Sequence, residues 1–203
     1  MIDLSSLILF AGALAIASGS PGPSIAALVA RVLSRGPRSV LPFLAAMWIG
    51  EAMWLTATVF GLALLAQTFQ TAFAVLKWAG VAYLLWLAWK SWSAPVGPAG
   101  SLPSAGSAWR LFGAGLAVTL GNPKIMVFYL ALLPSILDLG GVGIGGWLEL
   151  TLVMAAVLIV VDFAWVLAAA RARMLFRSPA GQRLANRLSG GMMAGAAGAM
   201  IAR

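Results

Sequence analysis

Three ionisable side chains lie inside long apolar stretches of this sequence, where a charge is costly. Glu51, Lys124 and Asp162 are each embedded among apolar residues. Placing an ionised side chain at the centre of a membrane costs at least about 2.5–3.5 kcal/mol on insertion scales, so each is a functional candidate. A buried carboxyl group can bind an ammonium group or carry a proton, and a buried ammonium can bind a carboxylate. The alternative is structural: a neutralised acid, or an ion pair that only joins helices.

Two interruptions in the apolar stretches point to the same region. Proline lacks an N–H donor, so a helix must kink or break there. The half-helix after a break begins with free N–H groups and a partial positive charge, which suit a carboxylate. A simple proline kink is the alternative, but two breaks in corresponding spans indicate a transport site. The interrupting residues are Ser20, Pro21, Gly22 and Pro23 in the first stretch, and Gly121, Asn122 and Pro123, followed by Lys124, in the other.

The composition places these residues in a membrane protein. Of the 203 residues, 62% are apolar and 9% are charged, and the mean hydropathy is +1.00. Soluble domains have about 45–50% apolar and about 25% charged residues, so a soluble protein is excluded. The formal charge of +8 comes largely from residues between apolar runs and does not predict nucleic-acid binding. With no Cys and no His, disulfides, soft-metal sites and histidine chemistry are excluded, and no cofactor is expected.

Six apolar runs predict an all-α integral membrane protein with six transmembrane helices, the first and fourth broken at their Pro motifs. None of these runs alternates apolar and polar residues, as a transmembrane β-barrel strand would. The last run is rich in Gly and Ala and covers only about 23 Å, so this span is thin or begins before Leu188. The runs are about Leu4 to Ala30, Val40 to Ala66, Val75 to Trp89, Leu111 to Leu137, Trp147 to Ala170 and Leu188 to Ala202.

A proline-containing linker divides this single transmembrane domain into two halves. Residues 94–109 separate a first repeat, 1–93, from a second, 110–203. Three spans in each half mean that the halves enter the membrane from opposite sides, which is an inverted repeat. Each half has a Gly-X-Pro break in its first span and a buried acid in its second. A cleaved signal peptide is disfavoured, because the chain start carries Asp3 and no Lys or Arg.

Basic residues are distributed asymmetrically between the two sides of the predicted membrane. The positive-inside rule puts the odd-numbered loops in the cytoplasm and both termini in the periplasm. A lipid-headgroup or nucleic-acid patch after the fifth run is the less favoured alternative. The other side has only Lys77 and Arg203. The cytoplasmic set is Arg31, Arg35, Arg38, Lys90, Arg110, Arg171, Arg173, Arg177, Arg183 and Arg187.

Residue counts place the three ionisable groups at similar depth. Glu51 lies about 17 Å, Lys124 about 21 Å and Asp162 about 12 Å from the predicted cytoplasmic end of its span. All three therefore fall in the middle half of the bilayer, and we expect them to converge on the two breaks.

These features resemble the LysE/RhtB family of bacterial amino-acid exporters. The resemblance covers essentially the whole chain, and its most specific element is Gly-Asn-Pro-Lys at 121–124. Other matching elements are Ser-Pro-Gly-Pro at 20–23, residues 77–84, and Phe128 with Leu133-Pro134. Glu51 departs from the family's more usual Asp, and the last span is unusually short and rich in Gly and Ala.

The resemblance implies export of amino acids or related metabolites across the bacterial inner membrane, driven by the proton motive force. The substrate carboxylate would meet residues 20–23 and 121–124, and its ammonium or the coupling proton would be taken by Glu51 or Asp162. Asp162 is the preferred proton carrier, because Lys124 pairs more readily with substrate than with both acids. The implied partners are the amino acid, protons and membrane lipids, with no nucleic acid. The particular amino acid and a homo-oligomeric state stay open.

Two other classes of function are weighed against export. A carrier of another small solute or cation is one, although a soft-metal carrier would use Cys or His. A lipid-modifying membrane enzyme is the other, and it would need clustered carboxylates near the headgroups to hold Mg²⁺. The deep, single acids of this sequence favour transport, and no enzymatic activity is expected.

Overall fold

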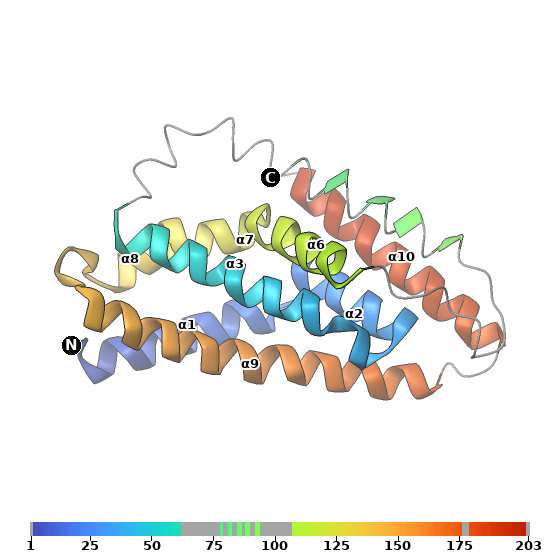
Figure 1. The fold of residues 1–203 in the computed structure, drawn as a ribbon, viewed down its shortest axis with the longest axis horizontal. Helices are drawn as coiled ribbons and strands as arrows, with labels where there is room; N and C mark the ends of the chain where they lie inside the picture. The colour runs from blue at the N-terminus through green and yellow to red at the C-terminus, as the bar shows by residue number, and fades with distance from the viewer. Residues whose placement is uncertain are drawn as a thin grey trace.

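The computed structural model describes residues 2–61, 78, 81–82, 85–86, 88–89, 92–93, 107–175 and 179–201. Every regular element within these ranges is helical, which confirms the all-α prediction (Figure 1). Most of the predicted third span lies outside the described residues. So do residues 94–106 of the linker, and Lys77, Lys90, Arg177 and Arg203.

The first apolar run forms two helices joined by a short extended segment. Helix α1 covers Leu4–Gly19, helix α2 covers Pro23–Arg35, and the two axes meet at 54°. The run therefore extends beyond Ala30, because nothing in the last turn of α2 breaks the helix until Gly36. Gly36 has φ +87°, a conformation that favours glycine, and it ends α2. A short helix, η1 (Pro37–Val40), then leads directly into α3 (Leu41–Val59).

The fourth run is divided into four pieces. Helix α6 (Ala108–Leu120) is followed by α7 (Pro123–Val127), the π-helix η2 (Phe128–Leu132) and α8 (Leu133–Ile136), with a bend of 50° after α6. Pro134 explains the π-helix, because it has no N–H for the carbonyl of Leu130. The helix widens instead, and the N–H of Leu133 bonds to the carbonyl of Phe128, five residues back.

The last two helices differ in length from their predicted runs. After η3 (Leu139–Gly141), helix α9 covers Ile144–Leu175, longer at both ends than 147–170. Because no Gly or Pro interrupts the sequence after Ala170, Arg171 and Arg173 belong to the helix and not to a loop. Helix α10 covers Pro179–Ile201, so the last helix begins before Leu188, and its 23 residues span about 34 Å.

Helix α9 is the long element against which the first broken helix packs. It contacts both α1 and α2, as Figure 1 shows along the lower edge of the molecule. At one end the N–H of Ile2 donates to Glu149 Oε2 over 2.8 Å. At the other, Arg173 Nε donates to the carbonyl of Leu33 in the last turn of α2, over 3.1 Å. The two halves of the broken helix are thus attached to the same straight neighbour on either side of the bend.

The other close helix pairs are α3 with α6 and α2 with α10. The α3–α6 contact depends on glycine, since a Cβ on Gly115 would lie 2.6 Å from the carbonyl oxygen of Phe43. Two apolar clusters result, one around α2, α3 and α6, and one around α1, α3, α8 and α9. The bends lie between these clusters.

Length and hydropathy identify membrane-spanning candidates among the described residues. Pro37–Val59 and Ile144–Met174 qualify as single helices, and the two bent pairs, α1 with α2 and α6 with α7–α8, bring the number to as many as four. Helix α10 is not among them, because Arg, Asn and Ser lower its hydropathy. A membrane setting follows, while six spans in two inverted repeats remain a prediction.

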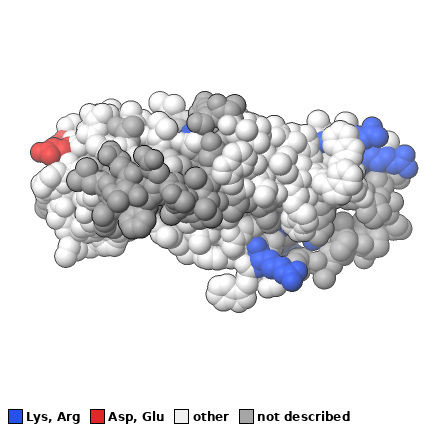
Figure 2. All heavy atoms as spheres, turned by 90° about the horizontal axis from the view of Figure 1, so that it is seen from above, with Lys and Arg blue, Asp and Glu red and all other residues white. Residues whose placement is uncertain are grey.

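Charges on the surface are separated along the long axis. Figure 2 shows acidic atoms at the end where α1 and α9 begin, and basic atoms toward the opposite end. The acidic end, where α1 and α9 begin, contains three of the five acids of the chain: Asp3, Asp138 and Glu149. The remaining two, Glu51 and Asp162, are buried.

Candidate functional site

The first break, from Ser20 to Gly22, is made by backbone chemistry. Pro21 and Pro23 lack N–H donors, and Gly22 precedes α2 in an extended conformation without a side-chain cap. The N–H of Ser20 still bonds to the carbonyl of Ile16, which closes the last turn of α1. Beyond that turn the chain turns through 54° and leaves the carbonyl of Ser20 outside any helix.

The second break, Gly121 and Asn122, carries its own cap. Asn122 Oδ1 accepts from the N–H of Lys124 over 3.0 Å and so caps α7. The amide nitrogen of the same side chain donates to Ser24 Oγ in the first turn of α2, also over 3.0 Å. Asn122 and Ser24 are both buried. One asparagine therefore caps its own helix and joins it to the other broken helix.

Lys124 also connects the two breaks. Its ammonium donates to the carbonyl oxygen of Ser20 at 2.7 Å and to Ser20 Oγ at 2.5 Å. Its aliphatic stem passes close to Gly22, where an added Cβ would lie 3.3 Å from Lys124 Cδ. Glycine at position 22 therefore permits the close approach of Lys124. Together with the Asn122–Ser24 hydrogen bond, these contacts place the two breaks against each other.

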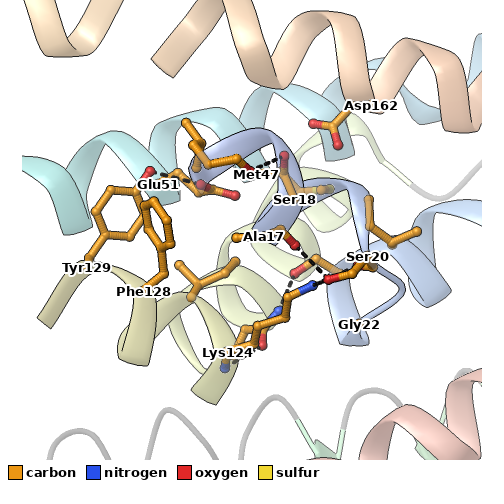
Figure 3. Close-up of a pocket in the computed structure, with 15 residues that line it drawn as sticks. Ala17, Ser18, Ser20, Gly22, Met47, Glu51, Lys124, Phe128, Tyr129 and Asp162 are labelled. Atoms are coloured by element: carbon orange, nitrogen blue, oxygen red, sulfur yellow. Dashed lines mark hydrogen bonds between the residues drawn. The ribbon is translucent and has the colours of Figure 1, made fainter. Parts of the chain in front are cut away.

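A partly open pocket lies at this junction (Figure 3), and its empty space together with the adjoining open solvent amounts to about 430 Å³. Its wall is mostly apolar, with a few polar groups at defined positions, which is typical of small-molecule sites. It collects six of the ten predicted site residues, whereas Pro21, Pro23, Gly121 and Pro123 shape the backbone without lining it. The lining is Leu14, Ala17, Ser18, Ser20, Gly22, Ser24, Ile25, Met47, Glu51, Asn122, Lys124, Ile125, Phe128, Tyr129 and Asp162.

Glu51 reaches the pocket from α3 and is held by a tyrosine. The hydroxyl of Tyr129 donates to Glu51 Oε2 over 2.9 Å, and both side chains are buried. Tyr129 lies in the π-helix η2, with its ring edge-on to Phe128 at 5.0 Å between centroids. The π-helix that Pro134 causes therefore shifts the register of the residues that follow α7 and includes the residue that contacts Glu51.

Asp162 reaches the pocket from α9 and is held by a tryptophan. Trp48 Nε1 donates to Asp162 Oδ2 over 2.8 Å. Trp48 lies on α3, three residues before Glu51, so one helix carries an acid and also the hydrogen-bond donor for the other acid. The ammonium of Lys124, the third ionisable group of the pocket, is directed to Ser20.

Tyr129 and Trp48 were not predicted from the sequence as site residues. Tyr129 is one of only two tyrosines in the chain, and a hydroxyl inside an apolar run is a usable signal. Trp48 offered none, because it is one of nine tryptophans and most of them suit a lipid interface equally well. No group of three or more His, Cys, Asp or Glu able to hold a metal ion occurs within the described ranges.

Apolar helices of membrane-spanning length, with a mostly apolar pocket between two helix breaks, define a multi-pass membrane protein. The chain matches the family model described as LysE type translocator over residues 15–203, and it belongs to that family. The family consists of transporters and not of enzymes.

Three relatives illustrate the range of similarity. A homoserine/homoserine lactone efflux protein of Salmonella typhimurium is 31% identical over 117 residues, 57% of each chain. The chemotactic transduction protein ChpE of Pseudomonas aeruginosa is 35% identical over 114 residues, 56% of each chain. A leucine efflux protein of Enterobacter sp. is 24% identical over 148 residues, 72% of this chain and 69% of the relative. The match thus spans little more than half the length of the first two relatives. No solved structure matches this chain.

Proposed function

We propose that this chain exports amino acids or closely related metabolites from the cytoplasm across the bacterial inner membrane, driven by the proton motive force. The observation that carries the proposal is the pocket between the two breaks, which is lined by one ammonium group and two carboxyl groups. An α-amino acid presents the complementary pair, a carboxylate and an ammonium a few ångströms apart. Membership of a translocator family and relatives named for homoserine and leucine efflux support the same substrate class.

The substrate carboxylate binds beside Lys124 in this proposal. There it competes with the carbonyl and hydroxyl of Ser20 for the ammonium hydrogens, and Ser24 and Asn122 supply further polar contacts. Pro21, Gly22, Pro23, Gly121 and Pro123 keep the backbone open around it. Apolar neighbours such as Met47, Ile25 and Phe128 receive the substrate side chain. Glu51 and Asp162 divide the remaining tasks, namely binding the substrate ammonium and carrying a proton.

The proposed architecture is six spans in two inverted repeats, 1–93 and 110–203, with both termini in the periplasm. The separation of acidic and basic residues along the long axis supports this orientation, since the basic end would face the cytoplasm. A reporter that is active only in the periplasm, fused after Arg203, is then expected to be active. Activity of a cytoplasmic reporter at that position would contradict the orientation.

Counterflow in proteoliposomes tests the function directly. Vesicles containing the purified protein and loaded with unlabelled amino acid are expected to take up the same labelled amino acid transiently, whereas protein-free vesicles are not. L-Homoserine and L-leucine are the first probes, and labelled glycerol phosphate is the negative control. Vesicles that exchange neither amino acid nor any other of a full amino-acid panel would contradict the proposal.

A further inference from the structure

The two acids of the pocket have hydrogen-bond donors of different chemistry. Within the described part of the chain, Asp162 accepts from the indole N–H of Trp48, and Glu51 accepts from the hydroxyl of Tyr129. An indole N–H only donates, whereas a phenol hydroxyl both donates and accepts. The two carboxyl groups are therefore equipped for different protonation behaviour, although both are buried in the same pocket.

Trp48 favours an Asp162 that stays ionised. Its N–H can be satisfied only by an acceptor, and a hydrogen bond to a carboxylate is stronger than one to a neutral carboxylic acid. Protonation of Asp162 would weaken this bond without creating a new one with Trp48. The second oxygen, Oδ1, stays available for a donor in the pocket. A fixed carboxylate with one open oxygen is suited to binding a substrate ammonium.

Tyr129 can serve Glu51 in both protonation states. It donates to the carboxylate, and after Glu51 takes up a proton the new O–H of the acid can donate to Tyr129 Oη. The phenol hydrogen then turns toward the pocket that Tyr129 lines. Tyr129 itself gains and loses no proton in this cycle, so one proton enters on Glu51 and the same proton leaves from it. A hydrogen-bonded partner in both states lowers the cost of cycling between them.

The groups around Glu51 suit a carboxyl group that gains and loses a proton. Its ionisable neighbours are Tyr129 on η2, Lys124 on α7 and Asp162 on α9, whereas α1 and α2 contribute serines to the pocket. In Figure 3 Tyr129 lies beside Glu51, on the side away from Asp162. The proton-carrying acid and the fixed acid therefore occupy different parts of one pocket.

We propose that Glu51 with Tyr129 carries the coupling proton, and that Asp162, held by Trp48, binds the substrate ammonium. Tyr129 and Trp48 are positioning residues in this assignment, and the proton belongs to Glu51 instead of Asp162. The inference rests on the proposed function as an amino-acid exporter. It gives the two acids separate roles and reverses the preference for Asp162 as proton carrier that the sequence analysis gave.

Two single substitutions separate the roles, because each removes one donor and keeps an aromatic ring. Tyr129→Phe is expected to move the pH profile of gradient-driven export upward by about one unit or more, since loss of a hydrogen bond to a charged group is worth about tenfold in proton affinity. Its half-saturating substrate concentration in exchange stays within twofold of wild type. Trp48→Phe is expected to raise that concentration about tenfold and to leave the pH profile in place.

Matched controls remove similar donors elsewhere. Trp147→Phe deletes an indole N–H that donates to Thr56 Oγ1, and Thr58→Val deletes a buried hydroxyl on the same helix as Glu51. Both are expected to keep the pH profile and the substrate concentration within twofold. Glu51→Gln, which keeps an acceptor for Tyr129, abolishes the gradient-driven component, and adding Tyr129→Phe to it changes nothing further.

The assay uses proteoliposomes with a mixture of labelled L-homoserine and L-leucine, measured by exchange and by export along a pH gradient. Wild-type protein that moves neither of these amino acids, nor any other of the full amino-acid panel, contradicts the proposed function, and the inference with it. Wild-type exchange combined with an unchanged pH profile in Tyr129→Phe, or a shifted one in Trp48→Phe, overturns the inference alone. Retention of gradient-driven export by Glu51→Gln, with its loss in Asp162→Asn, overturns it as well.

Discussion

The two helix breaks differ in where their stabilising contacts come from. Asn122 caps the helix after the second break with its own side chain. Gly22, the N-cap residue of α2 at the first break, has no side chain that could cap the helix. The polar groups at the first break are instead reached from the second, by Asn122 to Ser24 and by Lys124 to Ser20.

Because of this difference, the first break depends on side chains of the second, but the second does not depend in the same way on the first. A change at position 122 or 124 alters both breaks, whereas a change at Pro21 or Pro23 acts first on its own. In an inverted repeat the two breaks would be equivalent in topology, but here they are not equivalent in chemistry. The second break is therefore expected to be the more sensitive to substitution.

The largest effect is expected for Asn122→Ala, which removes the α7 cap and the contact with buried Ser24 together. Loss of an N-cap costs about 0.5–2 kcal/mol, and leaving a buried hydroxyl without its partner costs about 1–3 kcal/mol. A total loss of about 1.5–5 kcal/mol is expected, measured by the unfolding midpoint in detergent. Asn122→Ser is the control, since its hydroxyl keeps a cap acceptor while the amide donor to Ser24 is lost. Equal destabilisation by both variants would show that the cap contributes nothing.

Much of this arrangement follows from the sequence. Proline and glycine chemistry predicts both breaks, and the cost of buried charge identifies Glu51, Lys124 and Asp162 as residues with a common location. The described structure places all three on one pocket. These predictions succeed because each depends on a local rule: a missing N–H, or a charge within an apolar run.

The rest depends on contacts between distant segments. Trp48 and Asp162 are 114 residues apart, and Tyr129 and Glu51 are 78 apart, so no spacing rule links them. The π-helix depends on Pro134, whose effect on a helix is predictable as a kink but not as a change of register. The ends of α9 were underestimated because hydropathy falls at Arg171, while the helix continues until Leu175.

A smaller effect is expected for Lys124→Met, which keeps the aliphatic stem beside Gly22 and removes the ammonium. The variant loses both hydrogen bonds to Ser20. The expected loss of stability is only about 1–2 kcal/mol, because the side chain of Lys124 is partly exposed. In exchange assays the half-saturating substrate concentration is expected to rise about tenfold or more. Lys124→Arg is the control that keeps the charge. A normal substrate concentration in Lys124→Met would remove Lys124 from the substrate site.

A still smaller effect is expected for Gly22→Ala. The new methyl group would lie 3.3 Å from Lys124 Cδ, so the lysine stem must shift by a few tenths of an ångström. About 1 kcal/mol of destabilisation is expected, as for mild overpacking. Gly19→Ala is the matched control three residues earlier, where a Cβ would meet no atom within 4 Å. Destabilisation by Gly19→Ala of the same size would show that the effect is general to glycines at the first break and not due to the contact with Lys124.

The smallest effect is expected at the N-terminus of α1, far from the break. A side chain caps this helix start, as in α7, whereas α2 has no side-chain cap. Asp3 accepts from the hydroxyls of Ser5 and Ser6 and from the N–H of Ser6, and these hydrogen bonds hold its pKa below the usual range. Because the folded-state pKa is lowered, the cap stabilises fully above the ordinary value of about 3.9 and is lost as pH falls through the folded-state value. Hydrogen exchange of the first turn of α1 is therefore expected to stay constant from pH 7 to about 4, after correction for intrinsic rates, and to accelerate only below that. Asp3→Asn keeps a capping oxygen and should abolish the acid-dependent step, whereas Asp3→Ala should expose the turn at every pH. An acid-dependent step that persists in Asp3→Asn would assign it to another group.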